Sequence, residues 1–266
     1  MRRRCVAAVA LGIGLGGMSA FASPLHCPPH PIRLAFYRIG LFYTDRNGLD
    51  WDVAEELRRR SGCRFEYEVM PRARIWRELE AGKLDITLSA IATPERDRVY
   101  WFLNYIQLKQ YVLLSPKLPA AIDSMDGFIQ AGAPWRWAVV RSYSTSAYYD
   151  PLVAQLAAKG RVVEVPEEDS LYRLLGQNRV AGIFSTPMVY RQKLREFNLE
   201  DSVRVADWDK VSAPSPRGIV FTKRTFSEQD IGQWQALVDK MNRDGTMRRL
   251  IGRYMTPAET ETALWR

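Results

Sequence analysis

The chain has 266 residues, of which 38 are basic and 30 acidic, for a formal net charge of +8. Apolar residues make up 47% and charged residues 26%, which is ordinary for a globular protein and excludes a disordered chain. The length is enough to bury a substantial core, in one large domain or in two modest lobes.

The first 22 residues have the pattern of an export signal. Residues 2–4 are arginines, an apolar stretch follows, and Ala20-Phe21-Ala22 is a small-x-small cleavage site. Cleavage would leave 35 basic and 30 acidic residues, a charge of +5, in a periplasmic protein. Export argues against a nucleic-acid partner. An uncleaved anchor is the alternative, but the stretch is short for a span of about 20 residues and is rich in Gly.

Two cysteines remain after cleavage, because Cys5 leaves with the signal. In an oxidising compartment this even pair predicts a disulfide between Cys27 and Cys63, which the chain-entropy model values at about 4 kcal/mol. The alternative is a metal site, since His26, Cys27 and His30 cluster. Only three ligands are present and a Pro-Pro pair separates them, so we favour the disulfide and expect no metal.

No cofactor or catalytic motif stands out. Gly12, Gly14 and Gly17 spell the dinucleotide pattern G-x-G-x-x-G, but they lie in the signal segment and no strand precedes them. Both histidines lie at the start of the mature chain, and there is no Ser-His-Asp set, H-E-x-x-H or phosphate loop. We therefore expect no cofactor and no enzyme active site.

The first half of the mature chain alternates strands and helices. A helix capped by Asp50 should end at Gly62, and a second should begin at Pro71 and end at Gly82. The strands expected around these helices span residues 32–37, 64–69 and 86–90. This order favours βαβ units and a parallel sheet.

A second α/β set follows a connector with a short helix at residues 117–134. Its helices begin after the loop 141–146, at the acids 167–169 and at Thr186-Pro187. Ser227 opens a long helix through a capping box, Gly245 ends it, and a basic helix follows at residues 247–254. The strands expected in this half span residues 137–140, 162–165, 180–184, 203–206 and 218–222.

The stretch from Asp85 to Arg98 holds the strongest candidate binding residue. Thr93-Pro94 ends its strand, so Arg96 lies just past a strand end, beside the hydroxyls of Ser89 and Thr93. The crevice beyond strand ends is where open α/β sheets bind ligands, and a guanidinium suits a carboxylate. A surface ion pair is the alternative role for such an arginine.

Four motifs resemble the periplasmic solute-binding proteins of family 3. They are Gly48–Ala54, Leu79–Asp85, Ala92–Arg96 and Asp244–Thr246 with the following Tyr254. The resemblance implies an α/β fold of two lobes, the type II periplasmic binding protein clamshell, with mixed sheets flanked by helices and two extended hinge crossings. Lobe 1 would comprise residues 23–114 and 218–266, and lobe 2 residues 115–217.

The resemblance also implies a ligand site between the lobes. Arg96 would grip a carboxylate and Ser89 would add a hydroxyl, while the loop 142–146 would offer a helix N-terminus to the anion. Tyr37 and Tyr43 would form an aromatic wall or pack the lobe, and Arg141 would join the anion site or pair with a surface acid. The predicted ligand contacts are Arg96, Ser89, Thr93, Tyr37, Tyr43, Arg141, Ser142, Tyr143, Ser144 and Thr186.

The chain departs from the family at two positions. Amino-acid binders usually place an acid after a lobe 2 strand to hold the ammonium group, where this chain has Thr186. One more motif position, often Ser, is Ile91. A carboxylate or another anion without an ammonium group therefore fits the remaining residues better than a standard amino acid.

Three functions follow from the resemblance. The first is a monomeric binding protein that delivers a small anionic solute, an amino acid or a related compound, to an inner-membrane ABC permease. The second is an enzyme similar to the periplasmic cyclohexadienyl dehydratases, which use an acid in the cleft. Glu167 and Glu168 are the nearest candidates, but we interpret them as charges at a helix start. The third is a sensor that presents its closed form to a receptor.

Overall fold

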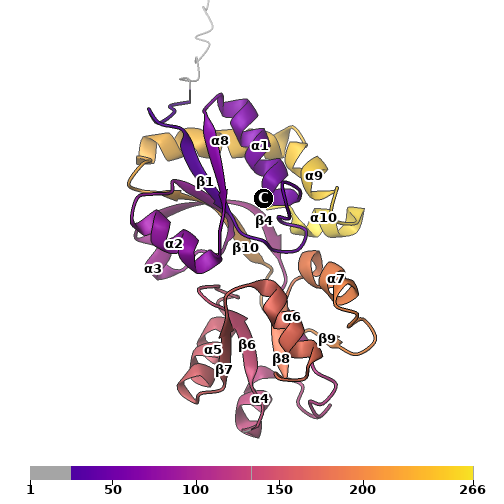
Figure 1. The fold of residues 1–266 in the computed structure, drawn as a ribbon. Coiled ribbons are helices and arrows are strands. Elements are labelled where there is room, and N and C mark those ends of the chain that lie inside the picture. Colours follow the sequence, from indigo (N-terminus) through magenta and orange to yellow (C-terminus); the bar gives the residue numbers. More distant parts are fainter. Residues whose placement is uncertain (1–24, 133, 266) are drawn as a thin grey trace, which may run out of the picture.

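The computed structural model describes residues 25–132 and 134–265 and consists of two α/β lobes (Figure 1). Each lobe is built on one mixed sheet flanked by helices, which confirms the predicted fold class. The predicted signal peptide, residues 1–22, lies outside the described residues and stays a prediction. In the part of the chain that the structure describes, no helix is both long and apolar enough to span a membrane.

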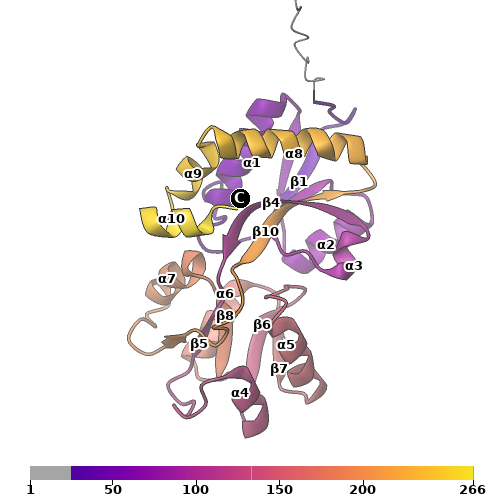
Figure 2. The ribbon, with the colours of Figure 1, turned by 180° about the vertical axis from the view of Figure 1, so that it is seen from behind.

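Lobe 1 has a five-stranded sheet in the order β2-β1-β3-β10-β4. The strands β1, β2 and β3 are parallel, as predicted, whereas β10 runs antiparallel to both of its neighbours. Figure 2 shows α8 lying across this lobe. Its elements are β1 (Ile32–Phe36), α1 (Leu49–Ser61), β2 (Phe65–Val69), α2 (Arg72–Glu80), β3 (Ile86–Ala90), α3 (Pro94–Asp97), β4 (Tyr100–Leu108), β10 (Ser215–Thr222), α8 (Glu228–Arg243), α9 (Thr246–Ile251) and α10 (Pro257–Ala263).

Lobe 2 repeats this plan with the order β7-β6-β8-β5-β9. The strand β6 is parallel to β7 and β8, and β5 is antiparallel to β8 and β9. Its elements are β5 (Tyr111–Leu114), α4 (Met125–Ala131), β6 (Trp137–Val140), α5 (Tyr149–Ala158), β7 (Val162–Val165), α6 (Glu168–Gly176), β8 (Gly182–Ser185), α7 (Pro187–Glu196) and β9 (Arg204–Ala206).

Strand pairing shifts both lobe boundaries from their predicted places. The strand β5 pairs with β8 and β9, so the chain leaves lobe 1 at Lys109–Gln110 and not after residue 114. On its return, β10 already pairs with β4 from Ser215, before the predicted boundary at residue 218. The sequence pattern could not locate these boundaries, because the partner that decides the sheet of a strand lies far away in the sequence.

The start of α1 differs from the prediction in the role of Asp50. The residue before the helix is Gly48, with φ +116°, and a Cβ atom there would lie 2.3 Å from the carbonyl oxygen of Phe42. Only glycine fits this close backbone approach. Asp50 does not cap the helix, because its buried carboxylate turns inward to Ser89 and Tyr105. The helix ends at Gly62 in the left-handed conformation, as predicted.

The C-terminal region contains one helix more than the sequence analysis expected. Thr256 caps α10 through a capping box with Glu259, the same device that the sequence did reveal at Ser227 for α8. The helix α10 is only seven residues long and mostly polar, so hydrophobic periodicity gave no signal for it.

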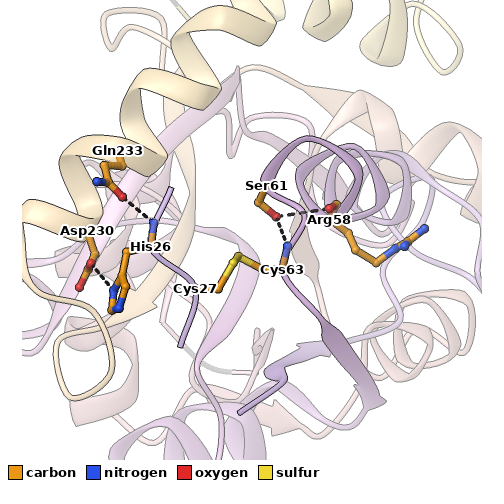
Figure 3. The surroundings of a disulfide bond; sticks show 7 residues. All are labelled: His26, Cys27, Arg58, Ser61, Cys63, Asp230 and Gln233. Atoms are coloured by element: carbon orange, nitrogen blue, oxygen red, sulfur yellow. Dashed lines mark hydrogen bonds and ion pairs between the residues drawn. A yellow bond between two sulfur atoms is a disulfide. The ribbon is translucent and has the colours of Figure 1, made fainter. Parts of the chain in front are cut away.

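The predicted disulfide is present between Cys27 and Cys63, with the two Cα atoms 5.5 Å apart (Figure 3). His26 accompanies it and ties the N-terminal segment to α8, through its backbone N–H to Gln233 (2.7 Å) and its ring to Asp230 (3.0 Å). His30 contacts a different acid, Asp85. The structure thus separates the three ligands of the alternative metal site, and the described residues contain no cluster suited to a metal.

Loss of the disulfide should destabilise lobe 1. The bond closes a loop with a sequence separation of 36, which the chain-entropy model values at about 4 kcal/mol. We expect the double variant Cys27→Ser/Cys63→Ser to unfold at a correspondingly lower urea concentration than the oxidised wild-type protein. Reductant should lower the wild-type midpoint and leave that of the double variant unchanged. Equal midpoints for the oxidised wild type and the variant would contradict the stabilising role.

Candidate functional site

A cavity of about 50 Å³ lies where the two lobes and the hinge meet. Its lining comes from the β1–α1 loop of lobe 1, from β6, α6 and β8 of lobe 2, and from both crossing segments. The polar side chains around it are those of Gln110, Ser144, Thr145, Glu168, Ser185, Thr186 and Arg217, and Tyr143 also lines it.

Arg217 occupies the hinge end of this cavity. It lies on β10, is 8% exposed, and donates from Nη2 to Oε1 of Gln110 on the other crossing segment (3.2 Å). Its Nε has no hydrogen-bond partner among the described residues. Burial lowers the pKa of Arg217, although the nearby tyrosines favour its charge. The sequence analysis missed this residue, although an arginine at a Pro-flanked crossing was visible.

Glu168 faces the same cavity from the first turn of α6. It is 5% exposed, and its Oε2 has no hydrogen-bond partner among the described residues. Burial raises its pKa to about 8, although the positive charges of Lys193 and Arg217 act to lower it. Glu168 is a charge at a helix start, as interpreted, but it is also buried, because the helix presents it to the lobe interface. Glu167, at the N-cap, is exposed.

Thr186 and Tyr143, both predicted to contact the ligand, line the cavity on the lobe 2 side. Thr186 follows β8, is buried, and its Oγ1 has no partner in the described part of the chain. Tyr143 meets Tyr37 of lobe 1 with ring centroids 5.5 Å apart, edge to face. An aromatic contact therefore joins the two lobes beside the cavity.

The loop 142–146 differs from the expected anion cradle. The Asp150 carboxylate of α5 accepts the backbone N–H groups of Thr145 (2.7 Å) and Ser146 (3.3 Å) and the hydroxyl of Ser144. The protein's own acid thus uses the donors that were predicted to hold a ligand. Its position four residues after Ser146, in the first turn of a helix, was the sequence signal for this role.

Arg96 lies past the end of β3, as predicted, and its guanidinium bridges the lobes. It donates to the carbonyl of Ile91 in lobe 1 (2.9 Å) and to that of Ser142 in lobe 2 (2.8 Å), and it lies 4.2 Å from the ring centroid of Trp76. Thr93 caps the short helix that carries it. Burial and the charge of Arg72 lower the pKa of Arg96 to about 10.

Arg96 lines a second pocket and not the central cavity. This pocket has a volume of about 620 Å³ and lies at the outer edge of the interface, over Trp76, Tyr100 and Ser142. Arg96, which was predicted to bind a carboxylate, therefore bonds to lobe 2 and lies outside the cavity that Arg217 and Glu168 share.

Arg72 is a third arginine of the interface, and the sequence analysis did not single it out. It starts α2, is 4% exposed, and donates from Nη1 to Thr87 and to the carbonyl of Leu88 (both 3.2 Å). Its guanidinium lies 4.4 Å from the ring centroid of Tyr37 and 4.8 Å from that of Trp76. A cation at a helix N-terminus opposes the helix dipole, which was the available signal.

A hydrogen-bonded network inside lobe 1 holds the hydroxyl of Tyr37. The hydroxyl of Tyr37 donates to the carbonyl of Ser89 (3.2 Å), and the hydroxyl of Ser89 donates to Asp50 (2.8 Å), which also accepts from Tyr105. Ser89 has φ +53°, a conformation that positions its carbonyl and hydroxyl on this network. Its hydroxyl is thus engaged inside lobe 1.

Two further predicted contacts lie away from the cavity. Tyr43 is buried and stacks on Phe36 with centroids 4.4 Å apart, so it packs lobe 1. Arg141 is exposed and pairs with Glu164 (3.3 Å). In both cases the structure matches the alternative role that the sequence left open.

Asp50 should make the stability of the protein depend on pH. Burial raises its pKa from 3.8 to about 6. The folded state therefore binds this proton more tightly than the unfolded state, and the contribution of Asp50 to the free energy of unfolding falls by about 3 kcal/mol as the pH rises from about 4 to above 6. Urea unfolding between these pH values should show a smaller decrease for Asp50→Asn, which keeps an acceptor oxygen but does not titrate.

The exposed Asp201→Asn is the matched control and should retain the wild-type pH dependence. The same slope in Asp50→Asn as in wild type would show that Asp50 does not titrate in this range.

Comparison with known proteins places this geometry in a family. Residues 42–257 match the bacterial extracellular solute-binding proteins, family 3. A search of curated proteins finds no significant match to the sequence.

Solved structures with the same fold include an ancestral arginine-binding protein bound to arginine, with a TM-score of 0.70 and 16% identity over 85% of this chain and 98% of that chain. The GluR0 ligand-binding core from Nostoc punctiforme in complex with L-glutamate has a TM-score of 0.68 and 16% identity over 85% of this chain and 100% of that chain. A histidine kinase sensor domain with similarity to periplasmic binding proteins has a TM-score of 0.70 and 11% identity over 89% of this chain and 98% of that chain.

At these identities the solved structures establish the shared fold alone. The family match extends over most of the chain, from the β1–α1 loop to the start of α10, and it includes both lobes and both crossings. This chain belongs to the bacterial extracellular solute-binding proteins of family 3.

Proposed function

We propose that the protein is a periplasmic solute-binding protein that encloses a small carboxylate-bearing solute, an amino acid or a related compound, and delivers it to an ABC permease. One observation carries this proposal. Three buried polar atoms without partners among the described residues line the central cavity, namely Nε of Arg217, Oε2 of Glu168 and Oγ1 of Thr186. Buried polar groups are normally hydrogen-bonded, and leaving one unpaired costs about 1–3 kcal/mol.

The chemistry of these atoms suits a small polar solute. The Arg217 guanidinium is a donor fork for a carboxylate, and the Thr186 hydroxyl can donate or accept. Glu168 can accept from an ammonium or hydroxyl group when ionised. It therefore supplies an acid that the sequence lacked at Thr186, and this reopens the possibility of an ammonium-bearing solute.

Solute entry requires the lobes to separate. A cavity of about 50 Å³ is too small for an amino acid. The contacts that must break include the hydrogen bond from Arg96 to the Ser142 carbonyl and that from the Leu41 backbone N–H to Met188. Hinge motion about two crossing segments is a known transition of periplasmic binding proteins, and a ligand that touches both lobes favours closure.

The solved neighbours support the solute class. Their ligands include arginine and L-glutamate, which both carry a carboxylate. The likeness to a sensor domain leaves transport and sensing open, because the two roles differ in the partner of the closed form. Delivery to a permease is the role that we propose.

Thermal unfolding in the presence of amino acids and small carboxylates tests the proposal. A bound solute at about 100 times its Kd should add about 2.7 kcal/mol to the free energy of unfolding. For that solute, Arg96→Met should raise Kd by about 10- to 100-fold, because a charged hydrogen-bonding partner and the clasp to lobe 2 are lost. The exposed Arg77→Met, on α2 and outside the pocket of Arg96, should bind as wild type does.

Two outcomes would count against these assignments. If no amino acid or small carboxylate stabilises the protein, the proposed solute class is wrong. Wild-type affinity in Arg96→Met would remove Arg96 from the binding site while leaving the function intact.

An enzyme on the same scaffold is the second candidate, and Glu168 favours it. With a pKa raised to about 8, its carboxyl is largely protonated at neutral pH and lies beside Arg217 in the cavity. A protonated carboxyl next to an anion-binding guanidinium can act as a general acid on a bound carboxylate. We give this function second place because the described cavity holds no base or nucleophile paired with Glu168.

A turnover assay separates the two candidates. Prephenate and arogenate, the substrates of the dehydratases that share this fold, should be recovered unchanged after incubation with the wild-type protein. Product formation that is lost in Glu168→Gln but retained in the exposed neighbour Glu167→Gln would favour the enzyme.

A further inference from the structure

Three arginines lie at the lobe interface, and none of them forms an ion pair with a carboxylate within residues 25–132 and 134–265. Their partners are neutral oxygens: Thr87 and a carbonyl for Arg72, two carbonyls for Arg96, and the Gln110 amide for Arg217. Arg72 and Arg217 are 4% and 8% exposed. Burying an unpaired charge is costly, so this arrangement calls for an external counter-charge.

The three guanidiniums form two separate positive poles. Arg72 and Arg96 share Trp76, whose ring centroid lies 4.8 and 4.2 Å from them, and they define the outer pole. Arg217 lies at the hinge beside Gln110 and defines the inner pole. Burial and the charge of Arg72 lower the pKa of Arg96, as expected when a like charge lies near a buried cation.

Tyr37 connects the two poles. Its ring packs on the Arg72 guanidinium at 4.4 Å and on the edge-to-face ring of Tyr143 at 5.5 Å. Tyr143 in turn lines the cavity that contains Arg217. A solute that lies along this pair of rings after opening would therefore have one pole at each end.

The carboxyl groups near the poles are engaged elsewhere or lack a cationic partner. Asp50 accepts from Ser89 and Tyr105, and Asp150 accepts from its own loop. Glu168 lies in the inner cavity, and its Oε2 bonds to no described residue. Glu80 and Glu95 line the pocket of Arg96, and Glu167 lines a pocket with Arg72. Among the described residues, none of these six carboxyl groups forms an ion pair with the three arginines, so the described part of the protein does not pair these cations.

We infer that the solute of this protein carries two anionic groups, one for Arg217 and one for the pair Arg72 and Arg96, as a dicarboxylate does. This inference rests on the proposed function and deepens it, because that function requires only one carboxylate. Closure would then bury each anionic group against a guanidinium and replace the water that both lose.

Isothermal titration with matched pairs of solutes tests the inference on the mature protein. Each pair keeps the shape and removes one charge: succinate against succinamate, glutarate against glutaramate, and L-glutamate against L-glutamine. The dianion of at least one pair should bind at least about tenfold more tightly, since a charge-assisted hydrogen bond contributes more than a neutral one. Higher salt should narrow that difference, because salt screens charge.

Arg217→Met assigns the inner pole. It should abolish the preference for the dianion over its amide partner, because the second anionic group loses its guanidinium. The control is Arg204→Met, an exposed arginine on β9 outside the cavity, which should keep the preference. Circular dichroism and the thermal midpoint of each variant establish that it folds, and Arg217→Gln repeats the test with a side chain that keeps polarity.

The outcomes separate the two levels of the proposal. Preference for the dianion that Arg217→Met or Arg217→Gln removes supports the inference. Equal or tighter binding of monoanions and zwitterions such as L-glutamine overturns the inference but leaves the binding function, and would point to Glu168 as the partner of an ammonium group. No binding of any carboxylate overturns both.

Discussion

Charged side chains that become buried where two lobes meet are the central constraint on this protein. The guanidiniums of Arg72 and Arg217 are almost inaccessible, yet they contact only neutral oxygens and aromatic rings. Burial of an unpaired cation is costly, so the stability of this arrangement depends on the hydrogen bonds and counter-charges that surround the guanidiniums.

The chain crosses between the lobes twice, and these crossings link the buried arginines to the hinge. Because β4 continues into β5 and β10 returns from lobe 2, any change at the interface is linked to the hinge. Arg217 lies on one crossing and bonds Gln110 on the other. A solute that reaches Arg217 therefore contacts the hinge directly, and its charge can bias the angle between the lobes.

The predicted site residues divide between the central cavity, the pocket of Arg96 and the interior or surface of the lobes. The pattern before Pro94 located Arg96 past the end of a strand, and the order of elements located Tyr143 and Thr186 across from it. Glu168 was set aside because an acid at a helix start has a satisfactory local explanation, and Arg72 was not singled out although a cation at a helix N-terminus opposes the dipole. A local sequence pattern does not reveal which helix end faces another lobe, so it does not predict the burial of these residues.

The sequence by itself determined most of the elements, their α/β order, the family and the disulfide partners, because periodicity, capping residues and a single cysteine pair act over short range or leave one choice. The tertiary structure alone decided which sheet each crossing strand joins and that Arg217 and Glu168 share a cavity. These features depend on hydrogen bonds and burial between residues far apart in the chain, which no local pattern encodes.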